Sequence, residues 1–258
     1  MGIITISEIE RLKQWQLFLE KIKEAKAELG NPEILWYRGH SNEDFYLLPS
    51  LLRYKKGLQK EQELFYKFKR YADKSFKNRE SEWETLFDMQ HYGIPTRLLD
   101  WTETFGIALF FAAYYNKKFS TGKNAALYLL NPSRLNLHAG KSSVLRLPNE
   151  EASFPFSGIY FHKRPFAANS PIAIEPVFHN DRITAQRGTF TVHDDSTDSI
   201  ESKYPNAIKK VILDDAIVPA ALDFLDMANI NEYSVFPDLG GIAGYLIQAS
   251  GLLDPETR

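Results

Sequence analysis

The feature that most restricts the fold is the segment 89–115, MQHYGIPTRLLDWTETFGIALFFAAYY. Thr102 or Asp100 can cap a helix that begins near residue 103, because a side-chain oxygen at that position accepts a hydrogen bond from an unpaired backbone N–H. The expected helix, residues 103–116, is apolar on nearly all sides. A helix of that kind is buried all round, so the rest of the chain must pack around it.

Helical patterns occur at both ends of the chain, with strand patterns between them. Expected helices cover residues 8–29, 60–77, 81–91, 216–227 and 238–250. Expected strands cover residues 34–38, 125–130, 172–175, 182–193 and 207–213. This order favours a single α+β domain whose mixed sheet of about 5–7 strands is flanked by N-terminal and C-terminal helices. We expect an N-terminal helix over 1–33, one compact unit over 34–250 and a tail over 251–258.

Composition excludes several classes of protein. The chain has no Cys, so disulfides, thiolate nucleophiles and Cys-based metal sites are excluded. The six His residues show no metal-ligand spacing, and the chain has no glycine-rich phosphate loop, HExxH or GxSxG motif. We expect a cytoplasmic protein without a membrane partner, because the first 30 residues lack a signal-peptide pattern and no run of 18 apolar residues occurs.

The basic segment 53–79 stands out from a chain whose formal net charge is only −2. It contains ten Lys and Arg residues against three Asp and Glu residues. One interpretation is a solvated helix face, and the other is an electropositive surface that attracts an anionic ligand or a nucleic acid.

Arg38 ends the apolar strand pattern ILWYR and is followed directly by Gly39 and His40. A buried guanidinium without a partner is costly, so Arg38 needs an anion nearby. A core carboxylate such as Asp100 can supply it. Alternatively, the rigid donor fork of Arg38 holds the phosphates of a ligand, and Gly39 lets that ligand approach the backbone.

Two further segments carry polar residues among apolar ones. The segment HYGIPTRLLDWT places His91, Arg97, Asp100 and Thr102 within twelve residues. A buried His beside a carboxylate can titrate near neutral pH. The expected strand 182–193 places Gln186 in its middle, where the amide serves either an inter-strand network or a polar ligand.

Four segments together resemble the FRG domain family, which is named for its (F/Y)RG motif. They are Trp36-Tyr37-Arg38-Gly39, QHYGIPTRLLDWT with the following ALFFA, ITAQRGTFTV, and YSVFPDLGGIAGYL at 233–246. The resemblance extends over residues 34–246. The layout is also similar to that of bacterial toxin and phage-defence modules.

The order of these motifs further resembles that of ADP-ribosyltransferases, which implies an ADP-ribosyltransferase-like fold and NAD as cofactor. By this resemblance Arg38 contacts NAD, the segment 91–102 and the following helix wall the nicotinamide, and Gln186 holds the ribose. The implied catalytic residues are Arg38, His91, Asp100 and Gln186. The implied cofactor-binding residues are Tyr37, Arg38, Gly39, His40, Arg97, Thr102 and Gln186.

One position departs from the transferase pattern, because Gln186 stands where a Glu is usual and an amide cannot act as a base. Asp100 or Glu103 can supply a carboxylate in its place. The alternatives are a module that senses NAD or another nucleotide without turning it over, and a module that binds or cleaves nucleic acid through the basic segment 53–79. Expected partners are a protein or nucleic-acid acceptor and a regulatory or antitoxin protein.

Overall fold

The computed structural model describes residues 6–75, 81–119, 122–147, 153–162, 170–178 and 180–251. The strands are β1 Trp36–His40, β2 Leu98–Thr102, β3 Ala125–Leu130, β4 Leu145–Arg146, β5 Ile172–Glu175, β6 Gly188–Val192 and β7 Ile208–Leu213. The α-helices are α1 Ile6–Glu28, α2 Gly57–Ala72, α3 Glu82–His91, α4 Phe105–Leu109, α5 Tyr115–Phe119, α6 Pro132–His138, α7 Asp181–Gln186, α8 Ile200–Lys203, α9 Val218–Met227, α10 Glu232–Val235 and α11 Leu239–Ala249. Two π-helical turns are η3 Phe110–Tyr114 and η4 Ser157–Phe161. Short 3-10 turns cover Ser50–Arg53, Asp73–Ser75 and Asp215–Ile217.

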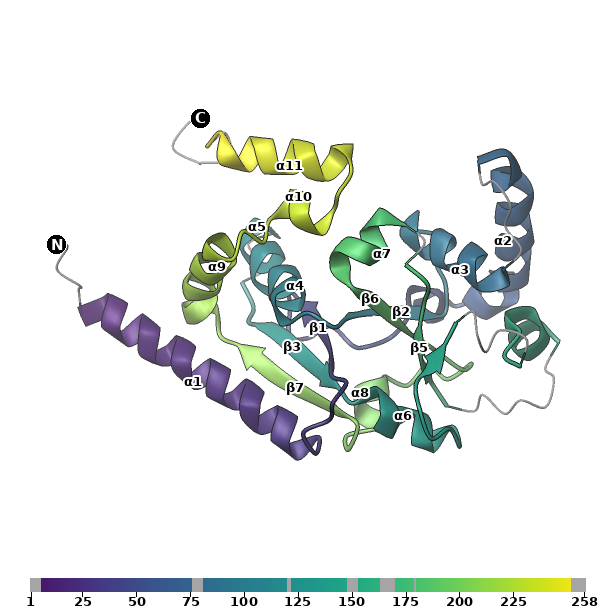
Figure 1. Ribbon diagram of the computed structural model, residues 1–258, viewed down its shortest axis with the longest axis horizontal. Helices are drawn as coiled ribbons and strands as arrows, with labels where there is room; N and C mark the ends of the chain where they lie inside the picture. The colour runs from purple at the N-terminus through teal and green to yellow at the C-terminus, as the bar shows by residue number, and fades with distance from the viewer. Residues whose placement is uncertain are drawn as a thin grey trace.

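The described strands form one mixed sheet in the order β4-β5-β6-β2-β1-β3-β7 (Figure 1). Only the β4–β5 pair is parallel among these seven strands, and the other pairs are antiparallel. The predicted α+β class and mixed sheet are therefore confirmed. The central strand β2 and its neighbour β1 carry the motifs LLDWT and WYRGH, respectively.

The two faces of the sheet are covered differently. One face, which we call the α6 face, is covered by a single core cluster that includes Trp36, Trp101 and Tyr128. The other, the α4 face, has two clusters. One joins α1, α4, η3 and α9 to β3 and β7, and the other joins α2, α3 and η4 to β5 and β6. The α4 face is therefore divided near its centre, where β1 and β2 meet.

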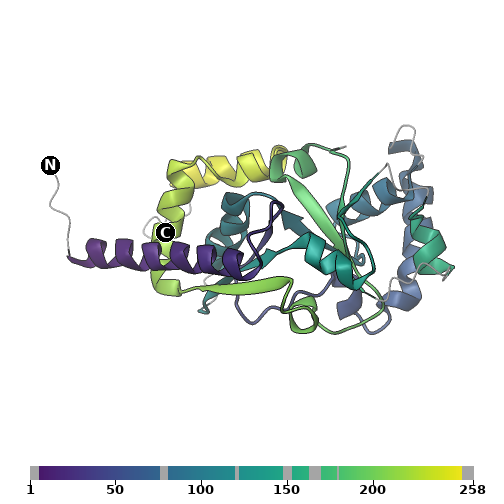
Figure 2. The same ribbon diagram turned by 60° about the horizontal axis from the view of Figure 1, so that its bottom comes forward.

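The expected buried helix is confirmed, with one change of pitch. It consists of α4, the π-helical turn η3 and α5 in succession, and Ala108, Phe110 and Ala112 are at most 1% exposed. π-helical turns inside α-helices frequently accompany functional sites. This composite helix crosses the sheet over β1 and β3 (Figure 2).

The expected strand 182–193 was wrong in its first half. Residues Asp181–Gln186 form helix α7, which begins where the Asn180 side chain accepts a hydrogen bond from the Ile183 N–H. Arg187 then takes a left-handed conformation with φ of 44°, and β6 begins at Gly188. Gln186 therefore lies at the end of a helix, because local capping outweighed the alternating pattern.

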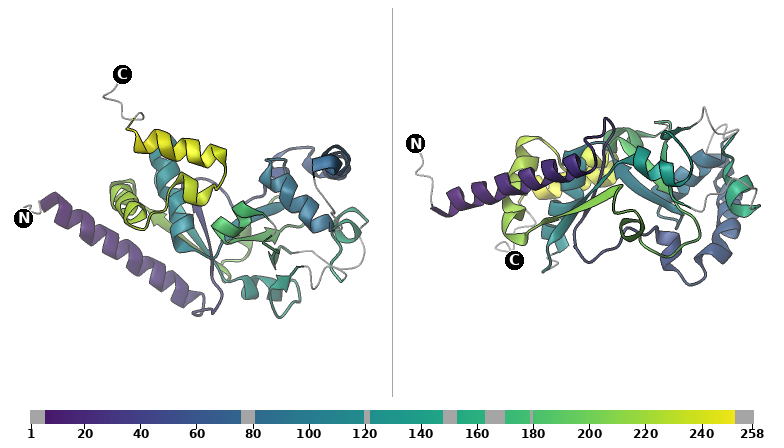
Figure 3. Two further views of the ribbon diagram at one scale, coloured as in Figure 1. Left: turned by 45° about the horizontal axis from the view of Figure 1, so that its top comes forward. Right: turned by 90° about the horizontal axis from the view of Figure 1, so that it is seen from below.

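The remaining elements surround this centre. Helix α1 lies along β7 and α9. The start of α1 and the end of α11 lie at the opposite end of the molecule from α2 (Figure 3). Within the described part of the chain, none of the helices combines the length and the apolar character needed to cross a bilayer. The motifs WYRGH and LLDWT thus lie at the middle of the sheet.

Candidate functional site

Strands β1 and β2 separate soon after they meet. They share a single register pair, Tyr37 with Thr102, whereas β1–β3 and β2–β6 each have five. Beyond Tyr37, the facing backbone groups of β1 and β2 are therefore not bridged to each other. Such a split in the centre of a sheet leaves polar groups that side chains or a ligand must satisfy.

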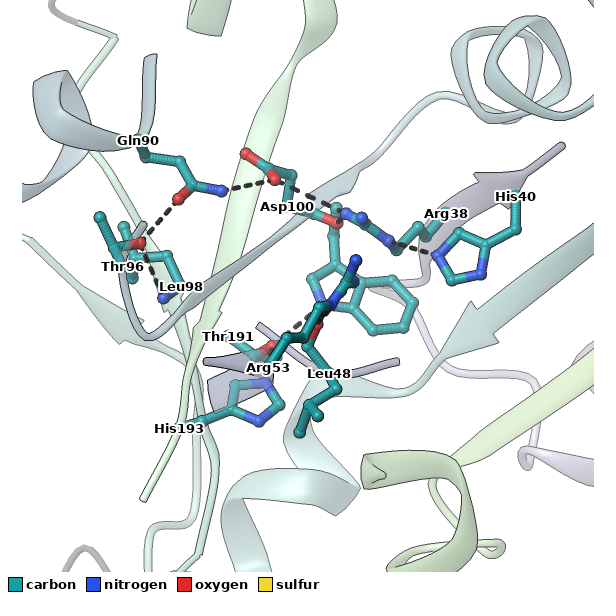
Figure 4. Close-up of polar contacts among 11 residues, drawn as sticks. Arg38, His40, Leu48, Arg53, Gln90, Thr96, Leu98, Asp100, Thr191 and His193 are labelled. Atoms are coloured by element: carbon teal, nitrogen blue, oxygen red, sulfur yellow. Dashed lines mark hydrogen bonds and ion pairs between the residues drawn. The ribbon is translucent and has the colours of Figure 1, made fainter. Parts of the chain in front are cut away.

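Arg38 fills this split. Its Nη1 donates a hydrogen bond to the Asp100 carbonyl at 2.5 Å, and the same nitrogen lies 3.6 Å from the Asp100 carboxylate (Figure 4). Its Nε donates to His40 Nε2 at 3.0 Å. The Arg38 side chain is 22% exposed and that of Asp100 is 51% exposed, so this pair reaches solvent. Burial lowers the pKa of Arg38, and Asp100 opposes that shift.

His40 holds Arg38 from the α6 face of the sheet. Its Nδ1 lies 3.2 Å from the Phe45 carbonyl, which can only accept, so Nδ1 carries the proton and Nε2 is the acceptor for Arg38. Burial, and secondly the charge of Arg38, lower the pKa of His40 to about 3. His40 is therefore a neutral group that fixes the orientation of the guanidinium.

Asp100 is held from its other side by Gln90 at the end of α3. Gln90 Nε2 donates to Asp100 Oδ2 at 2.8 Å, and Gln90 Oε1 accepts from the Thr96 hydroxyl at 2.6 Å. The Thr96 oxygen in turn accepts from the Leu98 N–H at 3.0 Å. This chain of bonds, visible in Figure 4, directs the Gln90 NH2 group toward the carboxylate.

A pocket of about 130 Å³, which we call the central pocket, opens beside this pair. Its walls come from β1, β2, α4, η3 and α7, and its lining residues are Tyr37, Arg38, Gly39, Asp100, Trp101, Thr102, Ile107, Ala108, Phe111, Arg182 and Gln186. Gly39 is required there, because a Cβ would lie 1.9 Å from the Ala108 carbonyl oxygen. The glycine lets helix α4 pack directly on β1 and form the pocket wall.

A smaller side pocket of about 40 Å³ adjoins the central pocket. The two share Asp100, Trp101, Arg182 and Gln186, and the side pocket adds His91. The structure therefore brings Arg38, Asp100 and Gln186 to the central pocket, and His91 to its neighbour. These residues come from four separate elements.

Two residues of the central pocket, Thr102 and Gln186, also connect its walls through hydrogen bonds. The Thr102 hydroxyl donates to the Gln186 carbonyl at 2.6 Å and accepts from the Thr104 N–H at 3.0 Å. Gln186 Nε2 donates to the Val235 carbonyl at 3.1 Å. The Thr102 hydroxyl is therefore used by backbone groups. One N–H group of the Gln186 side-chain amide is used by α10.

Arg97 lies away from both pockets, contrary to its expected place among the cofactor-binding residues. It is 1% exposed, and its Nε and Nη2 donate to the two carboxylate oxygens of Glu61 at 2.6 and 2.5 Å. Nη1 donates to the His193 carbonyl at 2.7 Å, and the guanidinium lies 4.3 Å from the centre of the Tyr160 ring. These contacts make Arg97 a core residue that joins α2 to β2.

The sequence patterns did not point to Gln90 and Arg182. Gln90 opens the segment QHYGIPT, and Arg182 stands four residues before Gln186, a spacing that becomes informative only once α7 is a helix. The basic segment, in so far as it is described, lines neither pocket. Among the described residues, no group of three or more His, Asp or Glu side chains is arranged to hold a metal ion.

This site can bind an anionic, polar ligand. Two arginines supply donors, Asp100 supplies an exposed carboxylate, and Tyr37 and Phe111 supply ring surfaces. Residues 33–121 match the family model of the FRG domain, which supports the resemblance to that family. No curated protein and no solved structure matches the chain.

Proposed function

We propose that this FRG-domain chain binds NAD in the central pocket and transfers ADP-ribose from it to a macromolecular acceptor. The observation that carries the proposal is the convergence of Arg38, Asp100 and Gln186, from three distant segments, on one pocket at the split between β1 and β2. The order of the motifs, which resembles that of ADP-ribosyltransferases, gives the same assignment. A bacterial toxin or phage-defence role would fit such an activity.

Arg38 is suited to the diphosphate. Its Nε and Nη1 are engaged by His40 and Asp100, while its Nη2 makes no hydrogen bond within the described part of the chain. Two N–H donors of a fixed guanidinium therefore remain for phosphate oxygens. Because His40 is neutral, it orients Arg38 without adding a second positive charge next to it.

Asp100 is suited to the reacting ribose. In the proposed reaction the bond between nicotinamide and ribose C1′ breaks, and its electron pair leaves with the nicotinamide nitrogen. The oxocarbenium-like ribose is stabilised by the carboxylate of Asp100. A nucleophilic group of the acceptor then bonds to C1′, and Asp100 accepts its proton.

The size of the pocket limits how much of NAD is enclosed. Its volume of about 130 Å³ is well below the roughly 300–1,000 Å³ typical of sites for drug-sized ligands. The pocket can therefore enclose one part of the dinucleotide, while the remainder lies in the open mouth. Phe111 and Tyr37, on facing elements, offer ring surfaces against which a nicotinamide can pack.

The test compares two carboxylates that lie three residues apart. Wild type, Asp100→Asn and Glu103→Gln are incubated with NAD, where water takes the place of the acceptor at ribose C1′, and released nicotinamide is quantified. Glu103 lines neither pocket, so Glu103→Gln should behave as wild type. Loss of the negative charge in Asp100→Asn should slow release by roughly 100-fold or more.

Each other outcome is informative. Equal release by wild type and Asp100→Asn would remove Asp100 from the reaction. Wild type that releases no nicotinamide, but whose melting temperature rises with NAD, would make the pocket a nucleotide sensor. If wild type shows no nicotinamide release and no change in melting temperature with NAD, the proposal of an NAD site is refuted.

A further inference from the structure

The C-terminal motif YSVFPDLGG has no part in the reaction described above, yet it lies beside the pocket. Helix α7 places Arg182 and Gln186 four residues apart, which is one helical turn, and both line the central and the side pocket. Gln186 contacts the last residue of α10, and Arg182 contacts the residue that follows α10. The C-terminal motif therefore sets the positions of the two polar side chains that α7 contributes.

The contacts are specific. The Val235 carbonyl accepts the Gln186 amide at 3.1 Å, and the Arg182 guanidinium lies 4.8 Å from the centre of the Phe236 ring. Phe236 is itself fixed by edge contacts to the rings of Phe110 and Phe111, at 6.4 and 5.9 Å between centroids. A guanidinium over an aromatic ring loses freedom while its N–H groups stay available at its edges.

Arg182 is an arginine of the pocket whose donors are not already used. Within the described part of the chain it makes no hydrogen bond and no ion pair. This differs from Arg38, whose Nε and Nη1 are bonded, and from Arg97, which is bonded on all three nitrogens. A partly buried cation that is oriented but unpaired is best explained by an anion that arrives from solution.

We propose that Arg182 is a second anion-binding residue of the pocket, and that together with Arg38 it selects ligands that carry a diphosphate. The two arginines belong to different walls of the same pocket, β1 and α7. A single phosphate can engage one of them, whereas two linked phosphates can engage both. This deepens the proposed function, because the diphosphate would be that of NAD, but it concerns binding and not turnover.

The experiment measures binding of ADP and of AMP by calorimetry to wild type, Arg182→Gln and Arg187→Asn. Wild type should bind ADP more tightly than AMP. Arg182→Gln should weaken ADP binding about tenfold or more and AMP binding less, because one charge-assisted set of hydrogen bonds is lost. Arg182 is half-buried and makes no polar contact with the described residues, so the melting temperature should stay near that of wild type.

Arg187→Asn is the matched control. It removes an arginine of the same segment that is 65% exposed and lines neither pocket. Asn tolerates the left-handed backbone at this position, where φ is 44°. ADP binding should be unchanged in this variant apart from a small effect of net charge.

The proposal is overturned if Arg182→Gln binds ADP as wild type does, or if wild type does not distinguish ADP from AMP. An equal loss in Arg182→Gln and Arg187→Asn would also overturn it, since that result would reflect net charge alone. ADP binding that depends on Arg182, without any nicotinamide release from NAD, would uphold this inference and refute only the transfer reaction.

Discussion

Arg38 and Arg97 lie in two similar sets of residues, and the difference between the sets separates the proposed site from the core. Each set contains an arginine, a carboxylate and a buried histidine. Arg38 has Asp100 and His40, and burial lowers the pKa of His40 to about 3. Arg97 is bonded to Glu61 and to the backbone carbonyl of His193, and burial likewise lowers the pKa of the His193 ring to about 3.

The sets differ in the exposure of their side chains and in how many donors and acceptors are left without a partner. The side chains of Arg97 and Glu61 are 1% and 6% exposed, and their pairing is bidentate. Those of Arg38 and Asp100 are 22% and 51% exposed, and their closest contact is to a backbone carbonyl. A set whose donors and acceptors are all used stabilises the fold, whereas one with unused groups at a pocket can bind a ligand.

The Arg97 set, whose donors and acceptors are used, is called the closed set here, and the Arg38 set the open set. The largest expected effect comes from the closed set. Arg97→Ala leaves Glu61 buried without its partner, which should lower the free energy of unfolding by roughly 3–5 kcal/mol. Urea denaturation followed by circular dichroism measures it. Arg146→Ala, which removes an arginine that is 66% exposed at the sheet edge, should change the value by less than about 0.5 kcal/mol. A similarly small change in Arg97→Ala would mean that the pair is not desolvated.

In the open set, removal of the arginine should leave stability nearly unchanged and abolish ligand binding. Arg38→Ala should change the free energy of unfolding by less than about 1 kcal/mol, since the Asp100 carboxylate that it leaves is 51% exposed and His40 is neutral. Nicotinamide release from NAD should fall about 100-fold. The rise in melting temperature that NAD causes should disappear. If Arg38→Ala unfolds as readily as Arg97→Ala, the two sets are equivalent and Arg38 is a core residue.

The sequence could place both arginines but could not tell them apart. Arg38 ends an apolar run, Arg97 precedes the apolar pair Leu98-Leu99, and each has candidate carboxylates nearby in the chain. The partner of Arg97, Glu61, lies 36 residues away on a helix that reads as a solvated basic face. Pairings of that kind depend on how α2 packs, which local patterns do not encode.

Local patterns were most reliable where burial alone decides the structure. The apolar helix after Thr102 and the strands β3, β5 and β7 were predicted from their composition. The first half of the predicted strand 182–193 was wrong, because a short helix with a cap at Asn180 shows the same alternation. The single bridge between β1 and β2, which creates the pocket, is a property of the assembled sheet.

The histidines should make both sets sensitive to acid. A pKa of about 3 in the folded chain, against about 6.5 in the unfolded chain, means that the unfolded state binds more protons between these values. The free energy of unfolding therefore falls as the pH falls through this window, by roughly 1.4 kcal/mol per pH unit for each His.

Replacement of one His at a time tests whether the sets respond alike. His40→Gln and His193→Gln should each make the pH dependence of stability between pH 6 and pH 4 shallower by that amount, as measured by urea denaturation at several pH values. If only His193→Gln does so, His40 becomes protonated in the folded protein. The open set would then differ from the closed one in its protonation as well as its exposure.

The smallest expected effect concerns Gln90, which positions Asp100 without lining the central pocket. Gln90→Leu removes one hydrogen bond to a carboxylate that is 51% exposed, so water can replace it. Nicotinamide release should fall about three- to tenfold, with little change in KM, because the carboxylate stays in place but is less well oriented. Gln90→Glu should be worse than Gln90→Leu, since two carboxylates would then repel each other. If Gln90→Glu retains full activity, the bond from Gln90 does not orient Asp100, and the open set would reduce to Arg38, Asp100 and His40 alone.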